Sequence, residues 1–247
     1  MRADQLLVER GLAASRSQAQ RLIAGGMRWH DGRDWRAVAK NGDEVPADAK
    51  LELADDAEAR YVSRGGLKLE GALKATGLAV SGWRCLDVGQ STGGFTDCLL
   101  VRGVAHVVGV DVGHAQLHER VRRDPRVTCI EGVNARALTA EDLGGARDFD
   151  LAVGDLSFIS LTLVLPAVAP LVKAGGHLLM LVKPQFELQP GDIGKGGVVR
   201  DVALYPRVES RIREACASVG LTVRQWLDSP IEGGDGNREF FVYATRS

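Results

Sequence analysis

The stretch "CLDVGQSTGGFTD" (residues 85–97) indicates the fold class of this 247-residue chain. It begins as an apolar strand that ends at Asp87, continues as a glycine-rich turn, and leads into the start of a helix. A strand that passes through glycines into a helix N-terminus is how α/β proteins hold a nucleotide. The stretch therefore predicts a nucleotide-like ligand and leaves open which one.

Strand-like and helix-like stretches alternate from about residue 84 onward. Strands are expected at 84–89, 106–112, 126–131, 149–155, 177–183, 221–227 and 239–245, and helices at 94–102, 114–123, 160–173 and 201–219. This alternation predicts an α/β fold with a doubly wound, largely parallel sheet, whose ligands bind at the carboxyl ends of the strands. Four charged residues fall at or near such ends: Asp87, Asp111, Asp155 and Lys183.

The first 60 residues differ from the rest and are expected to form a small α+β domain, separate from a second domain at 61–247. Two short amphipathic helices followed by short strands are expected at 3–11, 15–26 and 27–53. Ser15 and Gln18 have the spacing of a capping box at the start of the second helix. The acidic, alanine-rich segment 54–60 is expected to be the linker.

Composition and charge restrict the class of protein. With 45% hydrophobic residues and a net charge of −1, the chain is typical of a globular protein that must bind any nucleic acid through a local basic patch. The nearly apolar run 161–172 is too short to span a bilayer, and charges interrupt the N-terminus where a signal peptide would be apolar. The four cysteines lack zinc-binding spacing. We expect a monomeric cytoplasmic protein with no metal and no membrane partner.

The glycine turn fits neither of the common phosphate-binding motifs. A dinucleotide fingerprint needs a glycine where Ser91 stands, and a P-loop needs a lysine where Phe95 and Thr96 follow the glycines. S-adenosylmethionine carries no phosphate, and Asp87 could bind its ammonium while free amides between Gly89 and Gly94 bind its carboxylate. S-adenosylmethionine is therefore the expected ligand, and a nicotinamide nucleotide is the alternative.

Two residues beyond the turn support this ligand. Asp111 ends the next expected strand, 22 residues after Gly89, where a carboxylate commonly accepts hydrogen bonds from ribose hydroxyls. Asn134 follows the third expected strand, where its side chain could accept from the adenine amino group while the Ala135 amide donates to the ring. The alternative for each side chain is a turn or cap residue.

The ends of the fourth and fifth strands indicate which atom is methylated. Asp155-Leu156-Ser157-Phe158 lacks the prolines of enzymes that methylate exocyclic amines, and no cysteine is placed to attack a pyrimidine ring. Lys183 could instead take the proton of a hydroxyl group, because partial burial or a neighbouring cation lowers the pKa of a lysine. Asp155 could orient the ammonium group of Lys183 or help to remove its proton. The alternative is a lysine that merely ends a strand.

Lys68, Asp155, Lys183 and Glu239 together resemble the Lys-Asp-Lys-Glu tetrad of the FtsJ-like (RrmJ-type) ribose 2′-O-methyltransferases. The whole chain is similar to the TlyA family, also named hemolysin A, which joins a small RNA-binding domain to such a methyltransferase domain. The matching stretches are "LLVERGLAASRSQAQRLI", "YVSRGGLKLEGAL", "DVGQSTGGFTD", "GDLSFISL", "LVKPQFE" and "KGGVVRD".

The resemblance implies a Rossmann-like class I methyltransferase sheet of seven strands, the last antiparallel, preceded by a small α+β RNA-binding domain. It implies that Lys183 activates the target hydroxyl, held by Asp155 and Glu239, and that Lys68 contacts the target ribose. The donor-binding residues are expected to be Asp87, Gly89, Ser91, Thr92, Gly93, Gly94, Phe95, Asp111, Asn134 and Asp155. Gln90 stands where the family usually has a small residue, which could alter donor affinity.

The N-terminal helices resemble the RNA-binding domain first seen in ribosomal protein S-four, whose helix pair meets phosphates with basic residues. A guanidinium binds phosphate bidentately, so the expected contacts are Arg10, Arg16, Arg21 and Arg28. A solvated helix face is the alternative. The loop 193–201, expected to be flexible and to lie beside Lys183, is either a surface connection or a substrate lid, with Lys195 and Arg200 as further RNA contacts.

These features predict S-adenosylmethionine-dependent 2′-O-methylation of ribosomal RNA, with ribosomal subunits as partners and cytidine implied by the resemblance. A non-catalytic RNA-binding or assembly factor that keeps the donor pocket is one alternative, which the intact tetrad disfavours. A membrane-lysing protein is another, but the sequence offers no basic amphipathic helix with a large apolar face.

Overall fold

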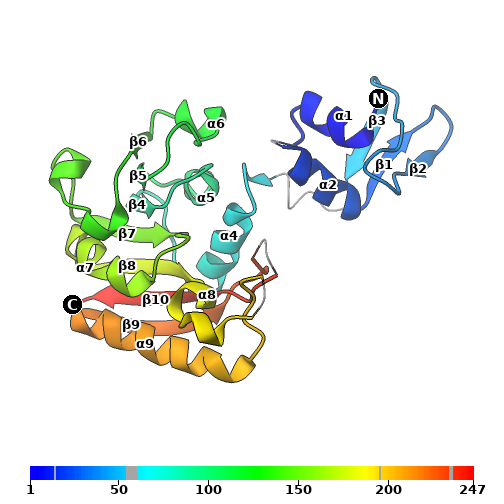
Figure 1. Ribbon diagram of the computed structural model, residues 1–247. Helices are drawn as coiled ribbons and strands as arrows, with labels where there is room; N and C mark the ends of the chain where they lie inside the picture. The colour runs from blue at the N-terminus through cyan, green and yellow to red at the C-terminus, as the bar shows by residue number, and fades with distance from the viewer. Residues whose placement is uncertain (14, 54–59, 195, 234–235) are drawn as a thin grey trace. The chain divides into compact units, whose positions relative to one another are not determined.

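The computed structural model describes the chain except for residues 14, 54–59, 195 and 234–235. The described residues form two compact units, Met1–Leu67 and Lys68–Ser247 (Figure 1). The boundary between these units falls inside helix α4 (Gly65–Thr76). The linker expected at 54–60 lies almost wholly outside the described residues.

The first unit packs two helices against a small antiparallel sheet. The helices are α1 (Ala3–Glu9) and α2 (Arg16–Ala24), and the sheet has the order β2-β1-β3, with β1 (Met27–His30), β2 (Trp35–Ala37) and β3 (Lys50–Leu53). Ser15 caps α2 by accepting a hydrogen bond from the Gln18 backbone amide at 3.3 Å, which is half of the expected capping box; the Gln18 side chain donates instead to the Tyr61 carbonyl at 3.2 Å. Almost fully buried side chains form the core of this unit, among them Leu6, Leu7, Leu22 and Met27.

The second unit is built on a seven-stranded sheet of order β6-β5-β4-β7-β8-β10-β9. Its strands are β4 (Arg84–Val88), β5 (His106–Asp111), β6 (Val127–Glu131), β7 (Phe149–Gly154), β8 (Val172–Val182), β9 (Leu221–Asp228) and β10 (Phe240–Arg246). The five strands from β6 to β8 are parallel, and β10 runs antiparallel to both of its neighbours. Each strand overlaps one expected from the sequence, so the fold class and the antiparallel last strand are confirmed.

Helices and short 3₁₀ segments connect these strands. The α-helices after α4 are α5 (Gly94–Val101), α6 (Glu119–Arg122), α7 (Leu165–Val168), α8 (Pro184–Glu187) and α9 (Tyr205–Ser218). The 3₁₀ segments are η1 (Ala135–Ala137), η2 (Glu141–Leu143), η3 (Leu161–Leu163), η4 (Ala169–Leu171), η5 (Pro190–Asp192) and η6 (Val202–Leu204).

Two helices expected from the sequence are wrong in extent. The region 160–173 forms η3, α7 and η4 in succession, because Pro166 and Pro170 lack an amide donor and each stands near the start of a new short helix. The expected helix at 114–123 is reduced to α6. The segment before α6 turns instead, and Ala115 takes a positive φ of 55°.

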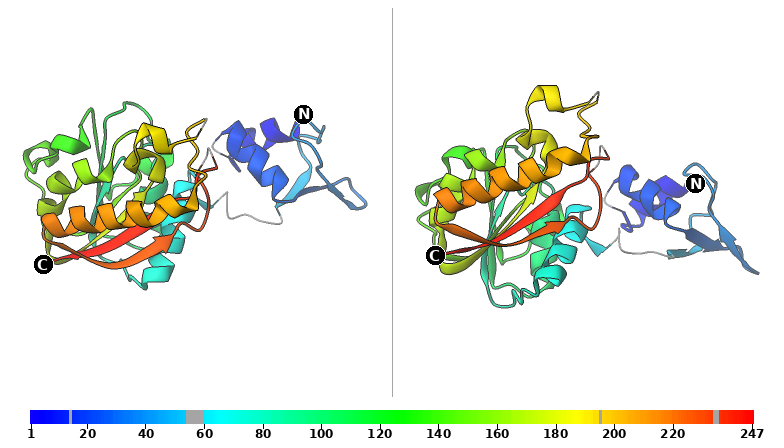
Figure 2. Two further views of the ribbon diagram at one scale, coloured as in Figure 1. Left: turned by 60° about the horizontal axis from the view of Figure 1, so that its bottom comes forward. Right: turned by 90° about the horizontal axis from the view of Figure 1, so that it is seen from below.

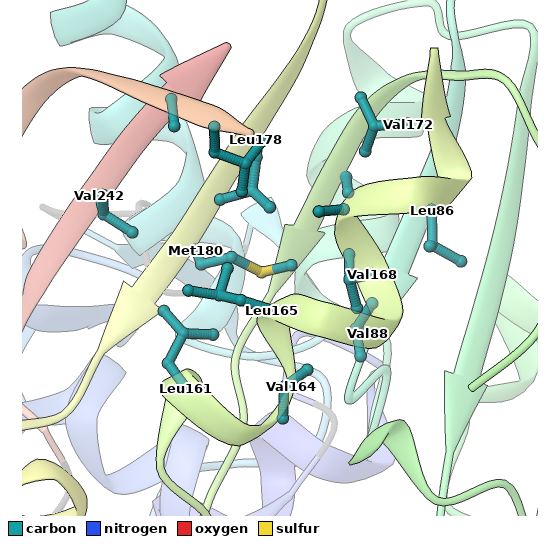
Figure 3. Packing of buried hydrophobic residues seen from close by; sticks show 14 of the residues in the cluster. Leu86, Val88, Leu161, Val164, Leu165, Val168, Val172, Leu178, Met180 and Val242 are labelled. Carbon is teal, nitrogen blue, oxygen red and sulfur yellow. The ribbon is translucent and has the colours of Figure 1, made fainter. Parts of the chain in front are cut away.

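Helices cover both faces of the sheet (Figure 2). Along β10, Val242 packs in the same cluster as Ile212 of α9, whereas its neighbour Phe241 stacks on Phe95 of α5 with ring centroids 6.1 Å apart. Figure 3 shows the first of these two faces, where β4 and β8 side chains pack against α7, among them Val88, Met180 and Leu165. Because the strands are buried on both faces, the carboxyl edge of the sheet is where polar side chains can meet a ligand.

Candidate active site

Three strands deliver charged side chains to one edge of the sheet. Asp155 directly follows β7, and Lys183 directly follows the neighbouring strand β8. Glu239 directly precedes β10, whose Phe240 pairs with Val182 at the end of β8. The antiparallel strand therefore begins where β8 ends, and it places Glu239 beside Lys183.

The four residues of the expected tetrad form two ion pairs. Lys183 Nζ lies 2.6 Å from Asp155 Oδ1, and Lys68, from α4, lies 2.5 Å from a Glu239 carboxylate oxygen. Lys68 and Glu239 are almost fully buried. Burial raises the pKa of Glu239, and the charges of Lys68 and Lys183 act in the opposite direction. The two lysines and two carboxylates thus balance each other's charge at this edge.

Three of the four tetrad residues line a cavity of about 360 Å³. Besides Lys68, Lys183 and Glu239, its walls include Ser157, Phe158 and Gly196. Lys183 Nζ donates a hydrogen bond to Ser157 Oγ at 2.8 Å. A cavity of this size, lined by two amines, a hydroxyl and a carboxylate beside two aromatic rings, fits a sugar-sized polar group.

Phe158 is placed in an unusual way beside this cavity. Its side chain is 91% exposed, and its φ of 63° is strained for a bulky residue. Its ring lies 5.3 Å from that of Phe186. The buried Glu187 fixes the loop, because its carboxylate accepts hydrogen bonds from the Ser160 hydroxyl and the Leu161 amide, both at 2.6 Å. Phe158 thus presents its ring to solvent beside the cavity from an anchored loop, where a ligand could reach it.

Asp87 lies beneath the glycine turn and is only 1% exposed. The Thr96 hydroxyl donates to Asp87 Oδ2 at 2.6 Å, and Gln90 Nε2 donates to Thr96 Oγ1 at 2.9 Å. Burial raises the pKa of Asp87 to about 7; the Thr96 hydrogen bond opposes this shift, and the carboxylates of Asp155 and Asp111 add to it. Asp87 Oδ1 is buried and accepts no hydrogen bond from the described residues. This oxygen is suited to a cationic group on a ligand.

The glycine turn joins the ends of three strands. Gly89 and Gly93 have φ of 82° and 91°, and a Cβ added at Gly89 would lie 3.0 Å from the Asp155 carbonyl oxygen. The Asp111 carboxylate accepts from the Ser91 amide at 2.7 Å. The turn after β4 is thereby held against the ends of β7 and β5.

Comparison with known proteins places this geometry in a family. The model of the FtsJ-like methyltransferases matches residues 61–246, a range that includes the tetrad and the glycine turn. The 16S/23S rRNA (cytidine-2′-O)-methyltransferase TlyA of Mycobacterium tuberculosis is 46% identical over 98% of this chain and 88% of its own length. The chain belongs to the TlyA family of FtsJ-like methyltransferases.

Other relatives of this family carry a different name. Hemolysin A of Brachyspira hyodysenteriae is 37% identical over 98% of this chain and 99% of its own length. A solved structure from Streptococcus thermophilus, described as a hemolysin, is 38% identical. It superposes with a TM-score of 0.76 over 100% of this chain and 88% of that one.

FtsJ-like methyltransferases use S-adenosylmethionine as their methyl donor, and acidic side chains beside the turn fit this ligand. The buried Asp87 Oδ1 offers an acceptor for the donor's ammonium. The Asp111 carboxylate accepts one hydrogen bond from the Ser91 amide and one from the Gly113 amide, both at 2.7 Å. Its remaining lone pairs can accept from ribose hydroxyls. Asn134 Oδ1 accepts from the Arg136 amide at 3.0 Å and so caps η1, which is the plainer alternative for that residue.

One expectation about the turn is met only in part. Its amides are not generally free for the donor's carboxylate, because those of Gly89 and Gln90 donate to the Val110 carbonyl at 2.9 and 3.0 Å. The Gly93 amide donates to the Gln90 carbonyl at 2.8 Å, and the Ser91 amide is held by Asp111. Three of these amides are engaged because the turn packs against the end of β5, where Val110 and Asp111 accept their hydrogen bonds.

Two side chains of the turn point into the protein. The Phe95 ring stacks on Phe241 in the core, so only its backbone is available to a donor. Gln90 is 3% exposed and occupies the space beside Gly109, where an added Cβ would lie 2.0 Å from Gln90 Nε2. Gln90 therefore reaches the donor site only through Thr96 and Asp87.

Arg10, Arg16 and Arg28, three of the expected RNA-binding arginines, have partners within the first unit. Arg10 donates to two backbone carbonyl oxygens. Arg16 pairs at 3.0 Å with the fully buried Asp4. Arg28 lies on strand β1 and not on the helix pair, and it pairs with Glu52 of β3 at 2.9 Å. These contacts within the small unit are present whether or not the same arginines also bind RNA phosphates.

The expected lid beside Lys183 is anchored where the structure describes it. In the loop 193–201, the Val199 amide donates to Asn237 Oδ1 at 2.9 Å, and Asn237 is almost fully buried. The loop is thus tied to the residues that precede Glu239. Arg200 is exposed at its end, and Lys195 lies outside the described residues.

Three residues of the site were not singled out from the sequence. They are Ser157, which contacts Lys183, Glu187, which anchors the Phe158 loop, and Asn237, which anchors the 193–201 loop. All three lie within a few residues of a tetrad member, and that proximity was the only sequence signal for them.

Proposed function

We propose that this protein transfers the methyl group of S-adenosylmethionine to the 2′-hydroxyl of a cytidine in ribosomal RNA. The observation that carries the proposal is the pairing of Lys183 with Asp155 beside the pair of Lys68 and Glu239 at one cavity. The name of the Mycobacterium tuberculosis relative, at 46% identity, supports both the ribosomal RNA and the cytidine.

The charged groups have separate roles in this reaction. Bound S-adenosylmethionine supplies an electrophilic methyl group. An aliphatic hydroxyl is a weak nucleophile, so Lys183 takes its proton as the methyl arrives, and Asp155 holds the amine in place. Lys68, fixed by Glu239, donates to oxygens of the target ribose. The buried Asp87 accepts a hydrogen bond from the ammonium of S-adenosylmethionine, and Asp111 accepts from its ribose hydroxyls. Asn134 lies next to its adenine.

The exposed Phe158 is suited to stack on the base of the target nucleotide. Base–aromatic stacking is worth about 1–3 kcal/mol, so Phe158→Ala should lower kcat/KM for the RNA by about 5- to 150-fold. Phe158→Trp should keep most of the activity. Leu163→Ala, which removes another exposed apolar side chain of the same segment, is the matched control and should behave like the wild type. Equal kcat/KM values for Phe158→Ala and the wild type would contradict this role.

The first unit, with a boundary proposed near residue 60, binds RNA phosphates through its helix pair. Replacing Arg16 and Arg21 together with glutamine should weaken binding and reduce the slope of log affinity against log salt by about 0.7–0.9 for each phosphate that is no longer neutralised. Glutamine is preferred to a charge reversal, because a carboxylate at position 16 would face the buried Asp4. Arg123→Gln, at the residue that directly follows α6, is the control. An unchanged slope in the double variant would assign these arginines to folding alone.

The proposed function is tested with tritium-labelled S-adenosylmethionine and unmodified ribosomal subunits. We expect label on RNA, recovered after nuclease digestion as a 2′-O-methylated cytidine. Tight donor binding with no label on either subunit would favour a non-catalytic binding factor. We further propose that the protein acts as a cytoplasmic monomer.

Some relatives are named hemolysins, and a vesicle-leakage assay tests whether this protein lyses membranes. In the part of the chain that the structure describes, no helix has the length and apolar character needed to cross a bilayer. We expect no dye release from phospholipid vesicles at protein concentrations that saturate methyl transfer.

A further inference from the structure

We propose that Ser157 is a positioning residue that directs the amine of Lys183 toward the 2′-hydroxyl of the target; this inference rests on the proposed function. Lys183 Nζ forms an ion pair with Asp155 Oδ1 at 2.6 Å and donates a hydrogen bond to Ser157 Oγ at 2.8 Å. Both Ser157 and Lys183 line the cavity. The amine is therefore held by an uncharged partner as well as by the carboxylate of the tetrad.

The need for a second acceptor follows from the shape of the amine. A neutral lysine nitrogen has two N–H bonds and one lone pair, in three directions around the bond from Cε. With Asp155 as its only partner, the group could rotate and point the lone pair away from the cavity. When Asp155 and Ser157 each receive one N–H, the lone pair takes the remaining direction, and it can face the incoming hydroxyl. Such orientation lowers the entropy cost of the reactive arrangement.

Ser157 is itself held in place relative to Lys183. It lies on the loop after β7, and Glu187 fixes that loop through the Ser160 hydroxyl and the Leu161 amide. Glu187 belongs to α8, which begins directly after Lys183. The acceptor hydroxyl and the lysine are thus tied to the same short segment, so their separation is maintained before RNA binds.

The proton and electron balance of the step is complete with these groups. The 2′-hydroxyl proton moves to the Lys183 lone pair while the oxygen forms a bond to the methyl carbon. The bond from that carbon to the donor's sulfur breaks, and its electron pair stays on sulfur, which becomes a neutral thioether. The positive charge passes from sulfonium to ammonium, and the three N–H bonds of Lys183 then point to Asp155, Ser157 and the new ether oxygen.

The test compares Ser157→Val with Ser157→Thr, two side chains of the same shape that differ in the hydroxyl group. Single-turnover methyl transfer to unmodified ribosomal subunits is measured at saturating donor and subunits. We expect Ser157→Val to lower the rate by about 10- to 100-fold, a part of the usual contribution of a general base. Ser157→Thr should stay within about threefold of the wild type, since it keeps the acceptor. Donor affinity and KM for the subunits should change little in either variant.

Three results would overturn the inference. The first is a Ser157→Val rate close to that of the wild type. The second is an equal loss in Ser157→Val and Ser157→Thr, because the effect would then come from packing and not from the hydroxyl. The third is a Lys183→Met variant that is fully active, because another base would then act. A wild-type protein that methylates no ribosomal subunit would instead overturn the proposed function, and this result is distinguishable from the other three.

Discussion

Replacing Lys183 with methionine should lower the rate of methyl transfer by about 10²- to 10⁴-fold, the range that general bases contribute. Methionine keeps the length of the side chain and removes the amine that lies 2.6 Å from Asp155 Oδ1. Donor affinity should remain close to that of the wild type, because Lys183 lines the acceptor cavity, whereas the glycine turn follows β4. Single-turnover transfer from labelled donor to unmodified subunits, together with donor binding by calorimetry, measures both quantities.

The same strand supplies a matched control for this variant. Lys173 lies near the other end of β8 and also pairs with an aspartate, Asp150. Lys173→Met should therefore remove a comparable ion pair and leave the rate of methyl transfer unchanged. If Lys183→Met lost donor binding to the same extent as activity, the lysine would belong to the donor site, and the base would have to be sought elsewhere.

Asp87→Asn should weaken donor binding by about 10- to 150-fold, the equivalent of the 1.5–3 kcal/mol typical of a hydrogen bond to a charged group. The asparagine can still accept from the Thr96 hydroxyl, so the turn should keep its shape. The same substitution should stabilise the free protein at pH 8. The pKa of Asp87 is about 7 in the folded protein, above its usual value. The free energy of unfolding of the wild type therefore falls as the pH rises from about 4 to about 7, where the folded protein still holds a proton that the unfolded chain has released. Near pH 4 the two proteins should have similar melting temperatures.

Donor affinity of the wild type should accordingly depend on pH. The donor's ammonium stays mostly charged below about pH 7.5, so Asp87 governs the change in this range. With a pKa of about 7, the ionised fraction of Asp87 falls about eightfold between pH 7.5 and pH 6, and the affinity should fall by the same factor. Thr96→Val removes a hydrogen bond that lowers this pKa, so the loss of affinity should begin at higher pH. A flat pH profile in the wild type would show that Asp87 does not meet the ammonium.

That Asp155 and Lys183 lie close together could be predicted from the sequence, because it follows from the order of parallel strands in the sheet. Parallel strands end at one edge of a sheet, so residues that directly follow β7 and β8 must lie near each other. The ion pair of Lys183 with Asp155 is consistent with that expectation. The pair of Lys68 with Glu239 does not follow from it, because Lys68 lies on α4 and Glu239 precedes an antiparallel strand; only the family resemblance had grouped these two residues. The strands themselves were identified because their apolar runs are long and are separated by glycine-containing turns.

The residues that the sequence did not reveal are those whose role depends on long-range contacts. Ser157 contacts Lys183, and Glu187 holds the Leu161 amide, each across 26 positions, and no periodic pattern marks either residue. Asn237 anchors a loop 38 positions away. A polar side chain in a loop has no amphipathic signal, so its partner is known only when the chain is folded.

The α/β class, the order of the strands along the chain, and the residue types that reach the ligand edge all follow from the amino-acid sequence alone, because periodicity and turn chemistry are local properties. The direction in which each side chain faces depends on the folded chain. Packing turned Gln90 and Phe95 inward, paired Arg28 with Glu52, and buried Asp87 deeply enough to raise its pKa to about 7. Burial and partner choice are set by neighbours distant in sequence, and those neighbours are brought into contact only by the fold.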